Sequence, residues 1–579
     1  MRKLGYSFIF VLLISGMAFP AGNPKHKLDI SFTQYHNYEQ LSEILHKMAD
    51  VYSNFIKLES IGKSYTRRDI WAVTINNKAT GPEQNKAAMF IQANIHGNEV
   101  QGSEVCLYTI WYLMENYGKI DKITELVDQR VFYILPTVNP DGRAFWFDEP
   151  NTSHSSRGGQ VPTDNDGDWL FDEDGFDDLD GDGEILEMRK RDPEGRFKTH
   201  PDDPRLMISA KDDEPGEFIY LGSEGIDNDG DGEINEDGPG GYDPNRNWPS
   251  EWQPRYIQYG AGDFPLSLPE SQAVADFILA RPNIAGVQGF HNAGGMILRG
   301  PGTGDLGDYS PEDVQVYEYL GKKGEKILPD YRYMVLYKDM YSVYGGFITW
   351  TFEDLGIFSF TNELFSIAQY YSQKFDEKSS WYERFIISDE ALIQFSDLVQ
   401  FGDLFVEWKP YNHPTYGEIE IGGWKKYSKR VDPTFILPET CHRNCAFTMF
   451  HAAQLPWPGI EEIEAIKIDD QLYRVRAGFT NMRLIPTVSA QAAIHHLHRA
   501  DLVTIEGKQA DIISAGWLTD KFNSTVEPVK GNPARVVMAD GVHFGEIKRV
   551  EWIVRGKGQV QIVLDCLKGG KVRKVVELK

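Results

Sequence analysis

The chain has 579 residues, with 59 Lys and Arg against 86 Asp and Glu, and its formal net charge is −27 at pH 7. A single hydrophobic core rarely grows beyond about 250 to 300 residues, so the length predicts two or three domains. The negative charge disfavours nucleic acid as a partner, because the phosphate backbone would be repelled.

The N-terminus has the pattern of a secretory signal. Residues 1–3, two of them basic, precede an apolar stretch from Leu4 to Phe19, and small residues follow at Ala21 and Gly22. We therefore predict a signal peptide over residues 1–21 and a secreted or periplasmic location, with an uncleaved anchor as the alternative. The stretch is shorter than the roughly 20 residues of a membrane span, and no later apolar run has that length. The mature protein is accordingly predicted to have no membrane span.

From about residue 28 to residue 400 the chain alternates strand-like and helix-like segments, which is the pattern of an α/β domain. Apolar runs with the length of buried strands alternate with segments whose apolar residues recur at helical spacing. Strands are expected at Ala87–Ile95, Val131–Val138, Ile284–Phe290 and Ile357–Thr361, and helices at Glu99–Met114 and Glu270–Leu279. We predict a mixed, mostly parallel sheet flanked by helices, in a domain over residues 22–407.

Between residues 148 and 241 this pattern gives way to Asp, Gly, Asn and Pro, which indicates an insertion. Ten acidic residues lie between Asp164 and Asp182, and seven between Glu224 and Asp237. Carboxylates recur there at alternate positions, twice before a Gly that permits a sharp turn, as calcium loops require. We predict that Ca²⁺ orders the insertion, with a solvated acidic loop as the alternative. The predicted ligands are Asp164, Asp166, Asp168, Asp178, Asp180, Asp182, Asp227, Asp229 and Asp231.

After residue 407 the chain changes to short alternating stretches, which favour strands. Examples are Gly417–Ile421, Leu472–Ala477, Val550–Val554 and Val560–Leu564, and one helix is expected near Cys441–Gln454. We predict a mainly β domain over residues 408–579, β-sandwich-like from about Pro456, with a structural or interaction role. Four cysteines do not make a disulfide scaffold in a chain this long. Cys441 and Cys445 can bridge one helical turn apart, or be free and packed.

A His-x-x-Glu pair follows the expected strand Ala87–Ile95, with His96 in the turn and Glu99 at the start of the next helix. Catalytic zinc usually takes three protein ligands of His, Asp or Glu type and leaves one position for water. The pair supplies two such ligands, although its spacing alone also occurs by chance.

Over most of residues 30–400 the order of further motifs resembles that of the pancreatic-type zinc metallocarboxypeptidase family. The matching segments, in chain order, are His96-Gly97-Asn98-Glu99, Val138-Asn139-Pro140-Asp141-Gly142, Met188-Arg189-Lys190-Arg191, Tyr242-Asp243-Pro244-Asn245-Arg246-Asn247-Trp248, Gly289-Phe290-His291, Tyr341 with Gly345-Gly346 and Trp350, and Ser359-Phe360-Thr361-Asn362-Glu363-Leu364. Nothing convincing extends beyond residue 400. The resemblance implies a peptidase that releases C-terminal residues from peptides or proteins.

The resemblance also implies the metal site. His96, Glu99 and His291 would hold one catalytic Zn²⁺, and Glu363 would act as general base toward a zinc-activated water. Asp243 would orient the imidazole of His96.

Substrate-binding roles are implied as well. Arg189 would stabilise the oxyanion that develops on the scissile carbonyl. Asn245, Arg246 and Tyr341 would bind the terminal carboxylate, since a guanidinium offers a planar fork that matches it. Ile348 falls at the side-chain specificity position, so we predict apolar or aromatic C-terminal residues, unless acidic residues on the nearby Gly-rich loop favour basic ones.

Two other functions are left open by the sequence. A zinc amidase or deacylase acting on cell-wall peptides or small amides would use the same metal ligands. A Ca²⁺-dependent binding or adhesion protein would keep the catalytic fold in an inactive form, although the expected ligands and the base Glu363 are all present. The oligomeric state is not predicted.

Overall fold

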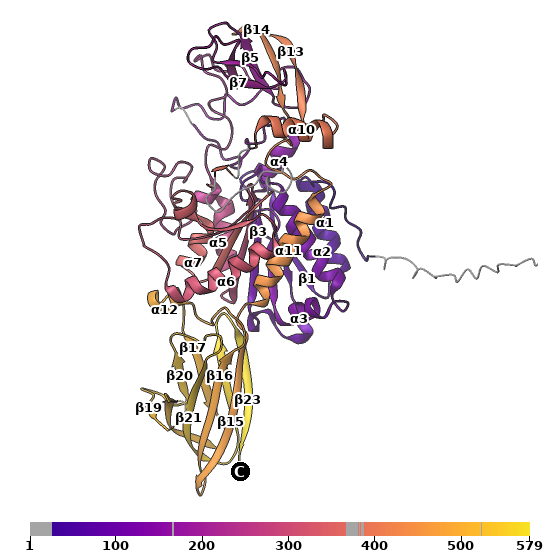
Figure 1. Ribbon diagram of the computed structural model, residues 1–579. Helices are drawn as coiled ribbons and strands as arrows, with labels where there is room; N and C mark the ends of the chain where they lie inside the picture. The colour runs from indigo at the N-terminus through magenta and orange to yellow at the C-terminus, as the bar shows by residue number, and fades with distance from the viewer. Residues whose placement is uncertain are drawn as a thin grey trace, which may run out of the picture.

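The computed structural model describes residues 26–164, 167–365, 380, 382–383, 387–520, 522 and 524–579, so the signal peptide predicted over residues 1–21 lies outside the described residues. Of the helices in this part of the chain, none is both long enough and apolar enough to cross a membrane. Figure 1 shows an α/β body in the middle, a sheet containing the insertion at one end, and a tail of two sheets at the other.

The body is built on an eight-stranded sheet with the order β1-β2-β4-β3-β9-β12-β10-β11. Its strands are β1 (Ile56–Lys63), β2 (Asp69–Ile75), β3 (Ala88–Ala93), β4 (Val131–Leu135), β9 (Ile284–Asn292), β10 (Met296–Arg299), β11 (Arg332–Val335) and β12 (Phe358–Leu364). The four central strands, β4, β3, β9 and β12, are parallel, whereas the pairs β1–β2, β2–β4 and β10–β12 are antiparallel. Every residue of β3, β4 and β9 is buried, which explains their near-continuous apolar runs. The predicted mixed sheet is confirmed.

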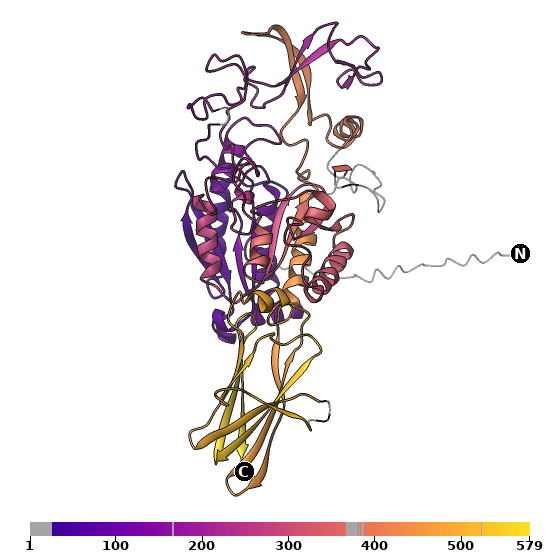
Figure 2. The same cartoon turned by 90° about the vertical axis from the view of Figure 1, so that its left-hand side faces the viewer.

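Helices cover both faces of this sheet (Figure 2). One face packs against α1 (Tyr38–Val51), α2 (Gln101–Asn116), α3 (Asp121–Gln129), α6 (Pro311–Ile327) and α11 (Leu437–Ala453), and the other against α5 (Pro269–Leu279) and α7 (Phe347–Glu353). Further helical segments are η1 (Lys78–Thr80), η2 (Glu83–Asn85), α4 (Pro140–Asp148), η3 (Pro244–Arg246) and η4 (Leu336–Met340). The two faces therefore hold two separate cores, and the predicted flanking by helices is confirmed.

The insertion contains secondary structure that the sequence pattern did not indicate. Its strands β5 (Glu187–Arg191), β6 (Phe197–Thr199), β7 (Met207–Ser209) and β8 (Phe218–Ser223) join β13 (Phe405–His413) and β14 (Gly417–Trp424) in a six-stranded sheet. A small apolar core connects this sheet with α10 (Asp389–Val399). The strand expected at Gly417–Ile421 thus pairs with the insertion, and β13 runs across the boundary expected at residue 407. The domain limits 22–407 and 408–579 stay a prediction.

The tail is β-rich, as predicted, and consists of a five-stranded and a four-stranded sheet. Its strands are β15 (Pro458–Asp469), β16 (Leu472–Asn481), β17 (Asp501–Glu506), β18 (Ala510–Leu518), β19 (Val526–Pro528), β20 (Arg535–Met538), β21 (Ile547–Gly556), β22 (Gly558–Cys566) and β23 (Gly570–Leu578), with the short helix α12 (Ala490–His495). Phe479, Val503 and Trp552 belong to one core shared by the two sheets, because inward-facing residues alternate along each strand.

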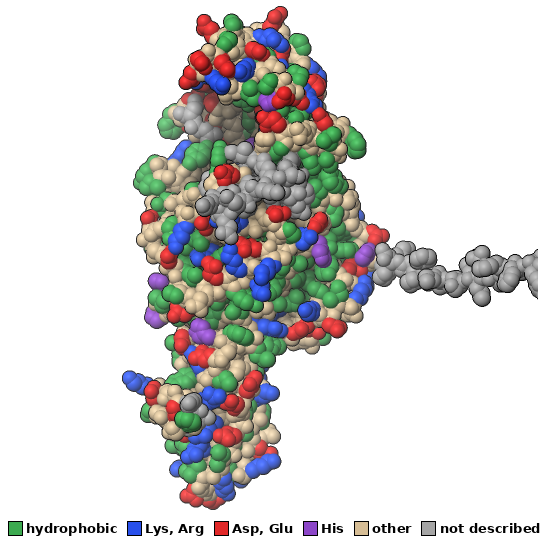
Figure 3. All heavy atoms as spheres, viewed as in Figure 1, with side chains coloured by type: hydrophobic (Ala, Val, Ile, Leu, Met, Phe, Trp, Pro, Cys, Tyr) green, Lys and Arg blue, Asp and Glu red, His purple; other side chains and the backbone are tan. Residues whose placement is uncertain are grey.

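Basic and acidic side chains are interspersed over the face in Figure 3, so the net charge forms no single acidic patch there.

Candidate active site

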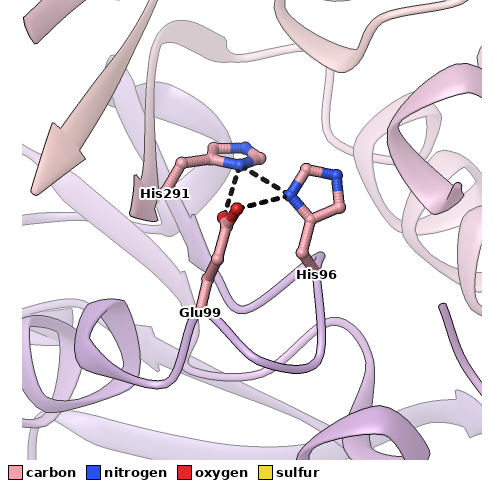
Figure 4. Close-up of side chains that lie close together, drawn as sticks. All are labelled: His96, Glu99 and His291. Atoms are coloured by element: carbon pink, nitrogen blue, oxygen red, sulfur yellow. Dashed lines mark hydrogen bonds and ion pairs between the residues drawn. The ribbon is translucent and has the colours of Figure 1, made fainter. Parts of the chain in front are cut away.

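The three predicted zinc ligands lie together at the carboxyl-end edge of the body sheet (Figure 4). His96 follows β3, Glu99 precedes α2, and His291 lies near the end of β9, which is the parallel neighbour of β3. Glu99 Oε1 is 2.9 Å from His96 Nδ1, and Glu99 Oε2 is 2.8 Å from His291 Nδ1. The two Nδ1 atoms are 3.1 Å apart. Parallel strands end at one edge of a sheet, and this brings together side chains that are 195 positions apart in sequence.

The arrangement fits a divalent cation. Each of the three residues offers one ligand atom, all three atoms lie within 4.8 Å of one another, and all three residues are buried. Two imidazole nitrogens and one carboxylate are the donor set of a catalytic zinc site with a position left for water. Burial by itself would raise the pKa of Glu99, but His96 and His291 hold that pKa well below its ordinary value. A cation between the facing nitrogens would satisfy both lone pairs at once.

Asp243 fixes the orientation of the first ligand. Its Oδ1 atom is 2.9 Å from His96 Nε2, so an Nε2–H donated to Asp243 leaves the Nδ1 lone pair directed at Glu99 and His291. Burial opposes the charge of Asp243, but Arg157 and His96 hold its pKa well below the ordinary value. The expected contact between Asp243 and His96 is present.

Glu363 lies beside this cluster on β12. In the parallel pairing of β12 with β9, Glu363 is in register with His291, which brings the carboxylate to the same edge of the sheet. Burial, with the Glu99 carboxylate as a further cause, raises the pKa of Glu363 to about 7. A carboxyl with such a pKa takes up and releases protons near neutral pH.

A cavity of about 360 Å³ contains the metal-ligand cluster, Glu363 and the predicted substrate residues Asn245, Arg246, Tyr341 and Ile348. Arg246 belongs to η3, whose capping residue Asp243 accepts a hydrogen bond from the backbone N–H of Asn245 at 2.7 Å. The side-chain Oδ1 of Asn245 in turn accepts from the backbone N–H of Phe347 at 2.9 Å, which connects η3 to α7. Ile348 of α7 is buried, whereas Tyr341 is 44% exposed.

Arg189 is not brought to this cavity. It lies in β5, where its guanidinium stacks between the rings of Phe218 and Trp408, with centroids at 4.1 and 4.0 Å. Its Nε donates to Glu420 Oε2 of β14 at 2.7 Å. The apparent match of the Met188-Arg189 segment to a family motif was misleading, because those residues are a strand of the insertion sheet.

Two arginines that the sequence analysis missed line the cavity instead, Arg157 and Arg430. Arg157 donates through Nε to Asp243 at 3.0 Å, and its Nη1 is 3.4 Å from Glu99 Oε1. The available signal was an Arg in a Ser-Ser-Arg-Gly-Gly stretch within the insertion, before its acidic residues. Its position, 89 residues before Arg246, concealed the connection between the two. Arg430 gave no signal, because it lies beyond the segments that resemble the family.

The acidic residues of the insertion form clusters only in part as predicted. Asp227, Asp229 and Asp231 can point three oxygens at one position, and Asp229 is also grouped with Asp168 and Glu173. Asp178 and Asp180 are grouped with Glu224 instead of Asp182. Asp164 accepts hydrogen bonds from the backbone N–H groups of Gly167 and Trp169, and Asp166 lies outside the described residues.

The four cysteines are buried and free. Of the two arrangements left open for Cys441 and Cys445, the structure therefore has the unbridged one, on α11.

Comparison with known proteins places the site in a family context. Residues 41–180 and 220–381 match the family model described as zinc carboxypeptidase, and residues 459–577 match a domain of unknown function. Carboxypeptidase D of Rattus norvegicus is 36% identical over 115 residues, which is 20% of this chain and 8% of that protein. Carboxypeptidase M of Mus musculus is 35% identical over 109 residues, 19% of this chain and 25% of that protein. The chain thus matches a quarter or less of the length of these relatives.

A solved structure of thrombin activatable fibrinolysis inhibitor is similar over 74% of this chain and 76% of its own, with a TM-score of 0.45 and 17% sequence identity.

Proposed function

Because the chain belongs to the zinc carboxypeptidase family, we propose that it is an active metallocarboxypeptidase that releases C-terminal residues from peptides. The observation that carries the proposal is a single cavity lined by His96, Glu99 and His291 together with Glu363 and Arg246. A metal site, a base and a carboxylate-binding cation in one space are the groups that hydrolysis of a terminal peptide bond requires.

Different residues of the cavity would carry out different steps of the hydrolysis. Zinc, when bound, supplies a Lewis acid that polarises the scissile carbonyl and acidifies a water molecule. Glu363 accepts a proton from the attacking water and returns it to the leaving amine, for which a pKa of about 7 is suited. We assign the stabilisation of negative charge on the carbonyl oxygen to Arg157, because its guanidinium lies against the same ligand carboxylate.

We propose that the C-terminal side chain of the substrate is apolar or aromatic. The cavity that Arg246 lines has an apolar part, formed by Leu298, Leu336, Met340, Val343 and Ile348. Among its described lining residues the only carboxylates are Glu99 and Glu363, so no acidic group remains to bind a basic side chain. The acidic residues of the Gly-rich loop, which left a basic preference open in the sequence, are Asp305 and Asp308. They contact Tyr344 and Lys338 and are not among the described lining residues.

The test is the release of single residues from peptides that differ only in the C-terminal residue: Phe, Leu, Lys and Arg. We expect zinc in about equimolar amount and faster release of Phe and Leu. Glu363→Gln is expected to lower kcat by roughly 10²- to 10⁴-fold with zinc content unchanged. Preferred release of Lys or Arg would refute the apolar preference.

Arg246→Lys is the matched control for the carboxylate clamp, because it keeps the charge and removes the planar fork. It should raise KM for free C-termini more than it changes kcat, and amidation of the substrate C-terminus should abolish the difference between the two enzymes. Equal hydrolysis of free and amidated peptides would instead indicate an amidase.

We further propose that Ca²⁺ binds the insertion. The supporting observation is that Asp178 and Asp180 are grouped with Glu224, which lies in a different segment of the chain. Burial raises the pKa of Glu224 to about 7, and a bound cation would offset the cost of ionising it. Carboxylate oxygens from separate segments are what Ca²⁺ takes as ligands.

Removal of Ca²⁺ from the zinc-saturated enzyme tests this proposal. We expect a lower Tm and greater protease sensitivity between residues 160 and 240, and Asp180→Asn is expected to lower the Ca²⁺ affinity. Mg²⁺ at the same concentration is the control, since it demands a tighter octahedral geometry. An identical Tm with and without Ca²⁺ would contradict the proposal.

The N-terminal pattern of residues 1–21 supports export to a secreted or periplasmic location. Mass spectrometry of the mature N-terminus after expression in the native host tests this, with a new N-terminus near residue 22 as the expected result.

A further inference from the structure

Arg430 lines the candidate active site although the zinc carboxypeptidase match ends at residue 381. The segment that carries it is fastened to the sheet edge where the metal ligands lie. Asn292 Nδ2, next to His291, donates to the Arg430 carbonyl at 2.8 Å. Two residues further on, Gln101 Nε2 donates to Asp432 Oδ2 at 2.8 Å, and the Asp432 N–H donates to Gln101 Oε1 at 3.2 Å. The guanidinium is therefore held at this position by the backbone around it.

Protein groups use only some of the hydrogen-bond donors of Arg430. Nη2 donates to the Asn292 carbonyl at 2.6 Å and to Glu99 Oε1 at 3.2 Å, and Nη1 is 3.4 Å from His154 Nδ1. Nε is buried and has no hydrogen-bond partner among the described residues. A guanidinium has five N–H donors, and buried donors usually have partners. Because Nε is inaccessible, the donor left for a ligand in the cavity is on Nη1 or Nη2, whose four N–H groups make only the three contacts above.

A row of alternating charges runs along the cavity in the order Arg246, Asp243, Arg157, Glu99 and Arg430, of which all but Asp243 line the cavity. The successive N–O distances along this row are 3.9, 3.0, 3.4 and 3.2 Å. Arg246 and Arg430 are at its two ends, and the metal ligand Glu99 lies between them. The side chain of Arg246 is 9% exposed, whereas those of Arg157 and Arg430 are 38% and 15% exposed. Arg246 is thus the least exposed of the three arginines.

This order fixes the direction of a bound peptide. If Arg246 binds the terminal carboxylate and the scissile bond lies at the metal ligands, the acyl part of the substrate passes toward Arg430. We propose that Arg430 binds a carboxylate on the acyl side of the scissile bond, so that the enzyme prefers an acidic residue in the penultimate position. The inference rests on the proposed function, because it takes the orientation of the substrate from it.

The test uses three blocked tripeptides with the same apolar C-terminal residue and Glu, Gln or Lys in the penultimate position. For the zinc-loaded full chain we expect kcat/KM to be about tenfold higher for Glu than for Gln, and lowest for Lys. Arg430→Gln should bring the Glu-to-Gln ratio close to one, and Arg430→Lys should retain part of it. Lys429→Gln is the matched control: it removes the same charge one residue away, from a side chain that pairs with Asp389 at 3.6 Å.

A binding measurement accompanies the kinetics. In the Glu363→Gln background the uncleaved Glu peptide should bind about tenfold more tightly than the Gln peptide, and Arg430→Gln should abolish this difference. Equal kcat/KM for the three peptides in the wild-type enzyme would overturn the inference and leave the proposed function intact. A loss of zinc in Arg430→Gln with an unchanged Glu-to-Gln ratio would also overturn it, since Arg430 would then only position Glu99. No hydrolysis of any of the three would overturn the proposed function and the inference together.

Discussion

Glu353 is a buried acid that joins the segments carrying the predicted substrate-binding residues. It is 5% exposed, at the end of α7. Ser250, four residues after Arg246, donates its hydroxyl to Glu353 Oε2, and Tyr309 donates to Oε1 at 3.0 Å. Burial, with Glu251 and Asp354 as further causes, raises the pKa of Glu353 to about 7. The carboxyl of the folded chain is therefore mostly neutral below about pH 7.

This raised pKa predicts a pH-dependent stability. Because this pKa is higher in the folded than in the unfolded chain, the protonated carboxyl favours the folded state. Its contribution to the free energy of unfolding is complete below about pH 4 and is lost as the pH rises through 7. The loss amounts to roughly 3 kcal/mol at most, for a shift from the ordinary value near 4.5. Glu353→Gln removes the ionisation. We therefore expect the Tm of the variant, relative to that of the wild type, to rise between pH 5 and pH 8. Parallel Tm curves across this range would contradict the prediction, and the same change at the exposed Glu506 provides the control.

At the scale of elements, the strand pairing of the insertion sheet determines which arginine lies at the candidate active site. Arg189 is enclosed by β5, β8, β13 and β14, with Phe218 and Trp408 on either side of its guanidinium. Arg157 lies near the start of the insertion, before its acidic stretch, and contacts both Asp243 and Glu99. One residue is therefore enclosed in a sheet, and the other lines the cavity that holds the candidate metal ligands.

A pair of alanine variants separates these two roles. Arg157→Ala is expected to lower kcat/KM by roughly 10²-fold or more, because a charge facing the developing oxyanion is lost. Arg189→Ala is expected to lower Tm, since it removes one of the two arginines that pair with Glu420, Arg191 being the other, and leaves a gap between two rings, while kcat/KM changes little. Zinc content is measured in both variants. A large loss of activity in Arg189→Ala at unchanged zinc content would contradict this assignment.

At the scale of the whole molecule, the tail lies at the opposite end of the body from the insertion sheet (Figure 1). Backbone N–H groups of Ala490 and Gln491, at the start of α12, donate to the buried carboxylate of Asp313 in α6 at 3.0 and 2.8 Å. The described residues that line the catalytic cavity all precede β15, the first strand of the tail sheets. The tail thus contributes no described side chain to that cavity.

Asp313→Ala is expected to weaken the attachment of the tail without changing catalysis. Two backbone N–H groups lose their acceptor, at a cost of about 1–3 kcal/mol each if they stay buried. We expect a lower Tm and faster proteolysis between α11 and β15, with kcat/KM unchanged. Glu312→Ala is the control, because it removes an adjacent but exposed carboxylate. A fall in kcat/KM specific to Asp313→Ala would show that the tail acts on the active site.

The sequence by itself determined the α/β body and the β-rich tail, because buried parallel strands and alternating strands leave different hydrophobic patterns. It also predicted the residues of the candidate metal site, since His96 and Glu99 lie at the exit of one strand and His291 at the exit of another. Their meeting follows from the parallel pairing of β3 with β9. The signal peptide, the domain limits and the roles of the site residues stay predictions.

Only the tertiary structure decided the partners of the insertion and the set of arginines in the cavity. Short strands rich in charged residues, such as Glu187–Arg191, have no hydrophobic pattern, and their pairing with β14 depends on chain segments more than 200 residues away. A motif read along the chain therefore misplaced Arg189. Arg157 and Arg430 were identified only in the structure, where both contact the carboxylate of Glu99. Electrostatic interactions depend on distance in space and not on separation in sequence.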